Sequence, residues 1–237
     1  SSATTDISCF GLCDGTATPT PGGGTAPYSI TLNPILGGPA LTTPFNNLCA
    51  GTYYFIVIDD SSCTINDTIE IFAPNEILPN ATFTNITCNG LNDGTATTTP
   101  TGGDGTITSV VWTNLTTNTI LGVGPLSNLG IGQYEVVVTD GAGCEGKDTI
   151  TITDPPALTV SADATGASCG TICDGTALAT PNGGTPGTTG YTYNWNTLPT
   201  NQTSQTATGL CAGEYTVTVT DSMGCTSQDT TVINNLI

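Results

Sequence analysis

Short stretches in which apolar and polar residues alternate recur along the whole chain, and Gly, Pro, Asn and Asp separate them. Alternation with a period of two is typical of a strand that buries one face, and a preceding Gly-Gly turn strengthens that interpretation. No stretch carries the Leu, Ala, Glu and Lys pattern of a helix. We therefore expect an all-β chain, with strands at three groups of corresponding positions: 28–32, 108–112 and 191–195; 53–59, 134–140 and 215–221; 68–72, 149–153 and 230–233.

The strands recur because the sequence repeats itself. A motif in which Cys is followed by Asp-Gly-Thr-Ala begins at Cys9, at Cys88 and at Cys169, which gives a period of about 80 residues. A Pro, a Gly-Gly turn and a Leu-x-x-Gly-x-Tyr segment follow each copy in the same order. We predict three modules, called here the first, second and third repeat: residues 1–76, 77–157 and 158–237.

The pattern within one repeat also predicts a topology. About seven short strands with turn signals between them are typical of a Greek-key sandwich. The Leu-x-x-Gly-x-Tyr order resembles the tyrosine corner of immunoglobulin and fibronectin type III domains. We expect three tandem immunoglobulin-like (Greek-key) β-sandwich modules, stapled by disulfides, with Trp112 and Trp195 packed in their cores rather than stacked on a ligand.

The cysteines are distributed unevenly among the repeats. The first and third repeats have four each, whereas the second has only Cys88 and Cys144. The second repeat has Asn92 and Gly130 where its neighbours have cysteines, so these two positions lose their cysteines together. We infer inner bonds between the cysteines at these positions: Cys13–Cys49 and Cys173–Cys211.

The cysteines that remain in every copy would then form an outer pair within each repeat. These predicted bonds are Cys9–Cys63, Cys88–Cys144 and Cys169–Cys225. A four-cysteine zinc site is the rival interpretation, but the two cysteines of the second repeat could not complete a tetrahedron. Disulfides in every repeat indicate an oxidising, extracellular compartment.

The charge balance restricts the possible partners. Lys147 is the only basic residue beside 19 acidic ones, and the chain has no His. Contacts with nucleic acid or anionic lipid need cationic side chains, so neither is an expected partner. No apolar run approaches the 18 or so residues of a membrane span, and no secretion signal stands at Ser1. We expect a mature protein or a segment of a longer one.

Two sets of aspartates recur at corresponding positions of the repeats. Asp before Gly, or at a strand end before a Gly or Ser turn, commonly accepts hydrogen bonds from its own backbone. We interpret these residues as turn formers. The alternative is a Ca²⁺ site built from carboxylates and backbone carbonyls, although no EF-hand spacing occurs. The candidates are Asp14, Asp93 and Asp174, and Asp59, Asp140 and Asp221.

Catalytic chemistry is largely missing from the sequence. A hydrolytic triad in its usual form needs His, and no nucleophile elbow or phosphate-binding Gly-rich loop with a Lys is present. Carboxylate pairs could act as acid and base, but their recurrence in every repeat favours a structural role. We therefore expect no enzymatic activity and no cofactor other than a possible Ca²⁺.

The combination of Cys88-Asn-Gly-Leu-Asn-Asp-Gly-Thr-Ala, a Gly-Gly turn, a Trp strand, Leu-x-x-Gly-x-Tyr and Val-Val-Val-Thr-Asp-Gly-Ala-Gly-Cys144 resembles the SprB-type repeat. That repeat occurs in large surface adhesins of Bacteroidetes. The resemblance implies export through an outer-membrane route and display on the cell surface in filaments used for gliding or attachment. The chain departs from the simplest repeat in its inner cysteines, and no C-terminal sorting domain follows Ile237.

A third recurring aspartate, at Asp67, Asp148 and Asp229, is followed by Thr and then by an apolar residue or Thr. This order resembles the O-glycosylation signal of Bacteroidetes envelope proteins, which makes the threonines candidate attachment sites: Thr68, Thr149 and Thr230. An exposed strand also favours Thr, so a purely structural origin stays open.

The sequence thus predicts an extracellular structural or adhesive protein that forms a stalk or fibril on a bacterial surface. Its expected partners are neighbouring repeats or copies of itself in a fibre, covalent glycans and a surface polysaccharide. The alternative is a Ca²⁺-dependent carbohydrate-binding adhesin module.

Overall fold

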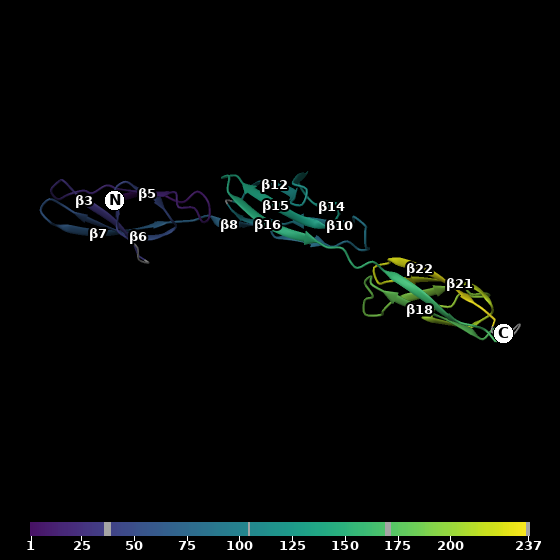
Figure 1. Cartoon of the computed structure of the whole chain (residues 1–237). Helices are drawn as coiled ribbons and strands as arrows, with labels where there is room; N and C mark the ends of the chain where they lie inside the picture. Colours follow the sequence, from purple (N-terminus) through teal and green to yellow (C-terminus); the bar gives the residue numbers. More distant parts are fainter. Residues whose placement is uncertain (36–38, 104, 169–171, 236–237) are drawn as a thin grey trace. The chain divides into compact units, whose positions relative to one another are not determined.

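The computed structural model describes residues 1–35, 39–103, 105–168 and 172–235 and consists of strands and loops (Figure 1). The prediction of an all-β chain is confirmed, since the described residues contain no helix. Accordingly, none of them forms a helix that could cross a membrane. The strands are β1 (Ser2–Thr5), β2 (Gly15–Pro19), β3 (Ser29–Pro34), β4 (Leu41–Thr42), β5 (Phe45–Leu48), β6 (Gly51–Ile58), β7 (Thr64–Ile71), β8 (Asn75–Leu78), β9 (Ala81–Thr84), β10 (Gly94–Thr98), β11 (Thr101–Gly103), β12 (Ile107–Asn114), β13 (Thr119–Gly122), β14 (Leu126–Leu129), β15 (Gly132–Asp140), β16 (Glu145–Ile152), β17 (Thr159–Thr165), β18 (Gly175–Asn182), β19 (Thr192–Trp195), β20 (Thr206–Leu210), β21 (Gly213–Thr220) and β22 (Thr226–Ile233).

The backbone divides into two compact units. Their segments interleave along the chain, so each unit contains residues from more than one predicted repeat. The first unit comprises Ser1–Ala81, Thr98–Gly124 and Tyr134–Thr149, and the second comprises Thr82–Thr97, Pro125–Gln133 and Ile150–Ile237. The division into three modules at the predicted boundaries stays a prediction.

Within the first unit, the first repeat forms a two-sheet sandwich. One sheet has the strand order β1-β2-β5 and the other has the order β4-β3-β6-β7. Phe45 and Leu48 from the first sheet and Leu32, Phe55 and Ile71 from the second are buried in one core. The chain crosses between the sheets after β2, after β4 and after β5, which is the immunoglobulin-like, Greek-key topology that the sequence predicts.

The rest of the first unit comes from the second repeat. β8 pairs with β11, and β12 lies between β13 and β15 in the sheet β13-β12-β15-β16. Trp112 of β12 pairs in antiparallel register with Val136 of β15, and both side chains are fully buried. Trp112 is therefore a core residue, as predicted.

The second unit contains the sheet β14-β10-β9 and a complete sandwich in the third repeat. Its two sheets have the orders β17-β18-β20 and β19-β21-β22. Ala177 and Leu210 from one sheet share a core with Trp195, Val217 and Ile233 from the other. Trp195 is also fully buried, and its indole N–H donates to the carbonyl of Ser204 at 3.2 Å.

The glycine of the Asp-Gly-Thr-Ala motif is required by close packing. A Cβ on Gly15, Gly94 or Gly175 would lie 2.7–2.9 Å from the Cγ2 atom of the isoleucine that ends the last strand of its repeat. These isoleucines are Ile71 in β7, Ile152 in β16 and Ile233 in β22. The added Cβ would also lie 2.9–3.0 Å from the carbonyl oxygen of Leu48, Leu129 or Leu210. Any larger residue would push these strands apart, so the motif is a packing signature.

The predicted tyrosine corner is present in the first and third repeats. The Tyr53 hydroxyl donates to the Cys49 carbonyl at 2.9 Å, and the Tyr215 hydroxyl donates to the Cys211 carbonyl at 3.1 Å. Each bond ties the start of the central strand, β6 or β21, to the preceding turn. The corresponding Tyr134 is buried, and this burial raises the pKa of its hydroxyl.

Candidate functional site: the disulfides and their aspartate loops

The inner disulfides lie where the comparison between repeats predicts them. Cys13 bonds to Cys49, and Cys173 bonds to Cys211. Each bond joins the loop before β2 or β18 to the turn that precedes the tyrosine-corner strand. In the second repeat, a Cβ on Gly130 would lie 2.7 Å from Oδ1 of Asn92, so the asparagine side chain occupies the space that the disulfide fills in its neighbours.

The outer disulfides join different repeats, and the predicted pairing within each repeat is wrong. The structure pairs Cys9 with Cys144 and Cys88 with Cys225, with Cα–Cα distances of 5.4 and 5.6 Å. The predicted bonds Cys9–Cys63, Cys88–Cys144 and Cys169–Cys225 are therefore not formed. Cys63 is exposed and has no disulfide partner among the described residues, and Cys169 lies outside them.

The physical reason is that the two outer cysteines of a repeat lie at opposite ends of its last strand. The backbone N–H of Ile7 donates to the carbonyl of Phe72 at 3.2 Å, which places the Cys9 loop beside the end of β7. Cys63 immediately precedes the first residue of that strand. Eight residues at about 3.3 Å each extend roughly 26 Å, whereas disulfide-bonded residues have Cα atoms within about 7 Å of each other.

We call the three loops that contain the later cysteine of each repeat the receiving loops: residues 59–63, 140–144 and 221–225. Their backbone geometry is nearly the same in all three. The first aspartate N–H donates to the cysteine carbonyl at 3.0, 3.1 and 3.0 Å in chain order. The same aspartate accepts the cysteine N–H on Oδ1 at 2.8, 2.9 and 2.9 Å.

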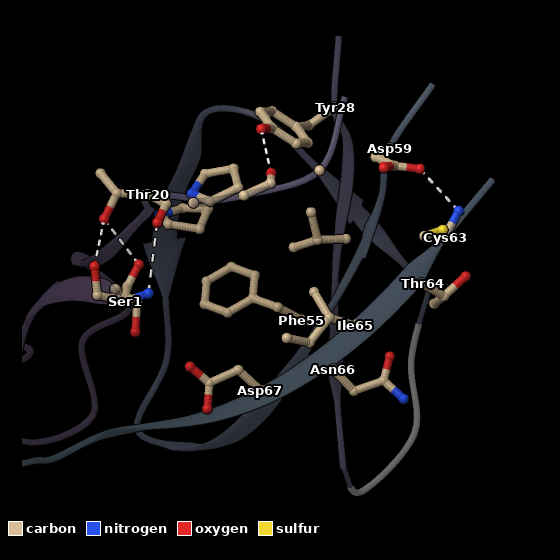
Figure 2. A pocket seen from close by; sticks show the side chains of 17 residues that line it. Ser1, Thr20, Tyr28, Phe55, Asp59, Cys63, Thr64, Ile65, Asn66 and Asp67 are labelled. Atoms are coloured by element: carbon tan, nitrogen blue, oxygen red, sulfur yellow. Dashed lines mark hydrogen bonds between the residues drawn. The ribbon is translucent and has the colours of Figure 1, made fainter. Parts of the chain in front are cut away.

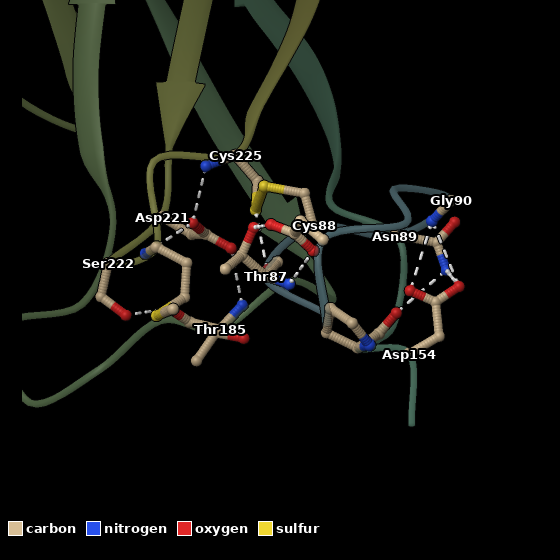
Figure 3. The surroundings of a disulfide bond; sticks show 12 residues. Thr87, Cys88, Asn89, Gly90, Asp154, Thr185, Asp221, Ser222 and Cys225 are labelled. Carbon is tan, nitrogen blue, oxygen red and sulfur yellow. Dashed lines mark hydrogen bonds between the residues drawn. A yellow bond between two sulfur atoms is a disulfide. The ribbon is translucent and has the colours of Figure 1, made fainter. Parts of the chain in front are cut away.

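The second carboxylate oxygen ties the receiving loop to the Gly-Gly turn. Asp59 Oδ2 accepts the N–H of Thr25 at 3.0 Å, and Asp221 Oδ2 accepts the N–H of Thr185 at 2.8 Å (Figure 3). Hydrogen bonds from the backbone N–H groups of Thr25 and Cys63 lower the pKa of Asp59. Burial alone would raise the pKa of Asp221, but four backbone N–H donors outweigh it and the pKa is lowered.

The loops that supply the earlier cysteine have their own recurring aspartate. Asp14 accepts the N–H of Ser8 at 2.9 Å and its hydroxyl at 2.5 Å. Asp174 makes the same two bonds with Ser168 at 2.7 and 2.6 Å, and Asp93 makes them with Thr87. The hydroxyl bond is the largest cause of the lowered pKa of all three carboxyl groups: Asp14, Asp93 and Asp174.

These aspartates act as turn formers in the structure. Their carboxylates accept hydrogen bonds from nearby backbone and hydroxyl groups, and in the described part of the chain no three acidic, Cys or His side chains are grouped as a metal site would require. The single ion pair among the described residues joins Lys147 to Glu145 at 3.4 Å on the surface.

The predicted glycosylation threonines lie at corresponding places on the last strand of each repeat. Thr68 is in β7, Thr149 in β16 and Thr230 in β22, and all three are exposed. The preceding carboxylate accepts the N–H of Thr68 at 2.9 Å and that of Thr149 at 2.8 Å. The Thr230 hydroxyl instead lies 2.8 Å from that of Thr216.

A pocket of about 470 Å³ lies beside the receiving loop of the first repeat (Figure 2). Phe55, Ile65, Asp59 and Cys63 are among its lining residues. It lies next to the Gly-Gly turn of the first repeat. Beside the corresponding turns of the second and third repeats lie the side chains of Ile77 and Leu158. A Cβ on Gly103 would lie 3.0 Å from Ile77, and one on Gly184 would lie 3.1 Å from Leu158, whereas one on Gly24 would meet only Asp59. The pocket therefore lies between the Gly-Gly turn and the receiving loop of the first repeat, with Phe55 of β6 and Ile65 of β7 in its lining.

Comparison with known proteins supports the resemblance that the motifs indicate. The sequence profile of the SprB repeat family matches residues 1–37 and 80–108. These two segments cover the start of the first and of the second repeat, including the Cys to Asp-Gly-Thr-Ala motif of each. No curated protein sequence matches the chain.

Solved structures similar to this chain are distant in sequence. The three N-terminal domains of the highly immunogenic outer capsid protein (Hoc) of bacteriophage RB49 are 12% identical over 100% of this chain and 98% of that chain, with a TM-score of 0.41. The N-terminal eight immunoglobulin domains of Down Syndrome Cell Adhesion Molecule isoform 1.30.30 are 12% identical over 88% of this chain and 33% of that chain, with a TM-score of 0.41.

Proposed function

We propose that this chain, which carries SprB-type repeat sequence, is part of an extracellular tandem-repeat protein that forms a stalk or fibril on a bacterial surface. The observation that supports this most strongly is the placement of the outer disulfides. Each connects one repeat to the next, so a pull on the chain is carried by covalent bonds between repeats as well as by the polypeptide. A protein that only had to stabilise single domains would be served by bonds within each repeat.

The composition suits this role. With 19 acidic residues and one Lys, the surface is strongly hydrated, and trypsin-like proteases find one basic residue at which to cut. Disulfides persist in oxidising surroundings such as the cell exterior. The partners that this role requires are neighbouring repeats, further copies of the chain and components of the surface on which the stalk attaches.

Surface labelling tests the proposal. Antibodies raised against residues 1–237 are applied to intact and to permeabilised cells of the native source, followed by gold-conjugated secondary antibody and electron microscopy. We expect gold along filaments on intact cells. Gold that appears only after permeabilisation would contradict the proposal.

We also propose that the exposed threonines of the last strands, Thr68, Thr149 and Thr230, carry O-linked glycans. Their exposure and the recurring Asp-Thr order support this. The intact mass of protein from the native source, compared with the 23.9 kDa of the bare sequence, tests it. A Thr68→Ala, Thr149→Ala and Thr230→Ala variant should lose the added mass, and a wild-type mass equal to that of the bare chain would contradict the proposal.

The alternative of a Ca²⁺-dependent carbohydrate-binding module has less support. The candidate carboxylates are engaged by backbone N–H groups, and Trp112 and Trp195 are buried in the structure rather than exposed for stacking on sugars. Glycan-array binding measured with and without a chelator tests it directly, and chelator-sensitive binding would favour it over a purely structural role.

A further inference from the structure

The hairpin of β12 and β13 in the second repeat exposes a group of large apolar side chains. Ile120 is 75% exposed and Val123 is 74% exposed, and Leu115 and Leu121 are also exposed. All four lie between residues 115 and 123, in the turn of the hairpin and in or just after β13. Single exposed apolar residues need no explanation, whereas a group of them on one element marks an interaction surface.

The fold does not require an apolar strand at this place, as the other two repeats show. In the first repeat the corresponding strand is β4, which has two residues, and its Leu41 packs against the core. In the third repeat the chain turns back, and the Trp195 N–H donates to the Gln202 carbonyl at 2.8 Å. The Gln202 side chain then bonds to the backbone of Thr208 at 2.9 and 3.0 Å. The exposed side chains of β13 therefore serve no packing need that the three repeats share.

β13 is the edge strand of the sheet β13-β12-β15-β16. The outer side of an edge strand offers N–H and C=O groups to another strand, and charged side chains commonly guard such edges. The opposite edge, β16, has such charges in Glu145, Lys147 and Asp148. The ladder of β13 with β12 shifts register between Ile120 and Gly122, and this bulge limits the length of any new ladder. Apolar side chains must therefore carry most of a contact made here.

The distribution of charge indicates which partner fits this edge. The chain has a net charge of −18, but no charged residue stands between residues 105 and 134. A partner recognised by charge would need charged groups on this hairpin. Two copies of the chain repel each other through their carboxylates, and at this hairpin they can meet without burying one. The occupant that fits is an extended, apolar and uncharged strand, and β13 itself has all three properties.

The side chains of two β13 strands also complement each other in shape. In an antiparallel pair centred on Leu121, Ile120 of each copy lies opposite Gly122 of the other, because both are one residue from the centre. A Cβ on Gly122 would meet no atom within 4 Å, so the space beside this glycine is open. The large side chain of Ile120 can therefore lie over Gly122 of a second copy.

We propose that β13 binds β13 of a second copy of this chain in an antiparallel pair, with Ile120 of each copy packed over Gly122 of the other. This proposal rests on the proposed role as a stalk or fibril and adds a lateral contact to it. The same patch serves both copies, so the contact closes on itself as a two-fold dimer. One pair of short strands buries little surface, and interfaces below about 1,200 Å² are typical of weak complexes.

Sedimentation equilibrium of the purified 237-residue chain over a series of protein concentrations tests the proposal. Free thiols are alkylated first, so that no disulfide can join two chains. We expect a monomer–dimer equilibrium that strengthens as salt is added, because salt screens the repulsion between the acidic copies. Ile120→Glu places a carboxylate in the contact and should weaken dimerisation by about tenfold or more. A wild-type chain that is monomeric at every concentration would overturn the proposal.

The matched control is Ile65→Glu. Ile65 is 67% exposed on β7 of the first repeat, so this variant adds the same charge away from the hairpin. It should dimerise nearly as well as the wild type. Both isoleucines are largely exposed, so neither variant should change the thermal unfolding of the monomer. Equal weakening of dimerisation by the two variants would show that net charge, and not the β13 edge, controls association.

A mixture of Ile120→Glu and Ile120→Lys chains tests the antiparallel pairing itself. In this pairing the two residues at position 120 are diagonal neighbours, which lie within reach of long side chains. Each variant alone should be monomeric because like charges meet, and an equal mixture should form dimers. Hydrogen exchange should show slower exchange of β13 amides in the mixture than in either variant alone. A mixture that stays monomeric would contradict the pairing.

These outcomes are separable from that of the surface-labelling test. A purified chain that stays monomeric but labels filaments on intact cells would refute the lateral contact and leave the stalk role standing. Dimers that depend on Ile120, formed by a protein that labels only permeabilised cells, would support the contact and refute the surface role.

Discussion

The loop that carries Cys144 and the loop that carries Cys63 fold alike, but only Cys144 is bonded within the described residues. Both have an aspartate that accepts the cysteine N–H, and both have a cysteine carbonyl that accepts the aspartate N–H. What differs is the supply of a partner, since Cys9 of the preceding repeat reaches Cys144. The comparison teaches that the loop is shaped to receive a cysteine from outside its own repeat, and that the local structure forms whether or not the bond does.

The largest expected effect is on the free energy of unfolding, which substitutions at Cys144 and at Cys63 should change by very different amounts. Replacing both Cys9 and Cys144 by Ser removes a cross-link that spans 135 residues, which the chain-entropy estimate values at about 5 kcal/mol. The Cys63→Ser variant removes no bond from the monomer and should unfold like the wild type. Guanidinium unfolding of the monomers, followed by tryptophan fluorescence, measures both.

The matched control for this difference is reduction. With a strong reductant present, the wild type and the Cys9→Ser, Cys144→Ser variant should unfold at nearly the same denaturant concentration. A Cys63→Ser variant as unstable as the double variant would contradict the assignment, because it would place Cys63 in a bond of the monomer.

The inner disulfide offers a second comparison, between the second repeat and its neighbours. Asn92 and Gly130 stand where the first repeat has Cys13 and Cys49. Introducing Asn92→Cys together with Gly130→Cys should form a third inner disulfide and stabilise the second repeat by up to about 4 kcal/mol, by the same loop-entropy estimate for about 38 residues.

The reciprocal variant, Cys13→Asn with Cys49→Gly, should destabilise the first repeat by a similar amount. Calorimetry before and after reduction gives both values. A double-cysteine variant that keeps two additional free thiols would show that the second repeat cannot close this bond.

The apolar side chains that pack against the Gly-Gly turns of the second and third repeats give a smaller predicted effect. Ile77 is 5% exposed and lies against Gly103 and Gly146 in the second repeat. Ile77→Ala should therefore lower the free energy of unfolding by about 2–4 kcal/mol, since truncating a buried isoleucine leaves a cavity. Leu158→Ala in the third repeat should cost less, because Leu158 is only half-buried. Equal losses in chemical denaturation would contradict this ranking.

The smallest effect concerns pH. The folded pKa of Asp59 and of Asp221 lies below the ordinary value, so each carboxylate stabilises the fold above the unfolded pKa, near 3.9, and this contribution is lost as the pH falls through the folded pKa. Asp221→Asn should lower Tm at pH 7 more than Asp59→Asn does, because Asp221 is only 6% exposed. Both differences from the wild type should shrink below about pH 3, as scanning calorimetry from pH 7 to 2 would measure. Differences that grow in acid would contradict the sign.

The all-β fold and its topology could be predicted from the sequence because they depend on local signals. Alternation, Gly-Gly turns and the Leu-x-x-Gly-x-Tyr segment each specify a strand or corner from a few neighbouring residues, and the bonds of Tyr53 and Tyr215 are found where expected. The inner disulfides were predictable for a different reason. The second repeat lacks both cysteines at the positions that correspond to Cys13 and Cys49. Because the two are missing together, the sequence indicates that they bond to each other in the repeats that have them.

The outer pairing could not be obtained in the same way. Every repeat keeps one cysteine of each outer type, so pairing within a repeat and pairing between neighbours give the same sequence pattern. What distinguishes them is the length of the last strand, and the predicted strand at 68–72 is shorter than β7, which begins at Thr64. A strand extended back to Cys63 would have placed Cys9 and Cys63 too far apart to bond.

Non-reducing peptide mapping tests the central claim, that outer disulfides join neighbouring repeats, most directly. Pepsin digestion at low pH suppresses disulfide exchange and can cleave beside Phe10 and Leu12, which separates Cys9 from Cys13. Mass spectrometry should then identify peptides linked through Cys9–Cys144 and Cys88–Cys225, each of which disappears on reduction. Peptides linked through Cys9–Cys63 and Cys88–Cys144 would contradict the account, because they would return every outer bond to a single repeat.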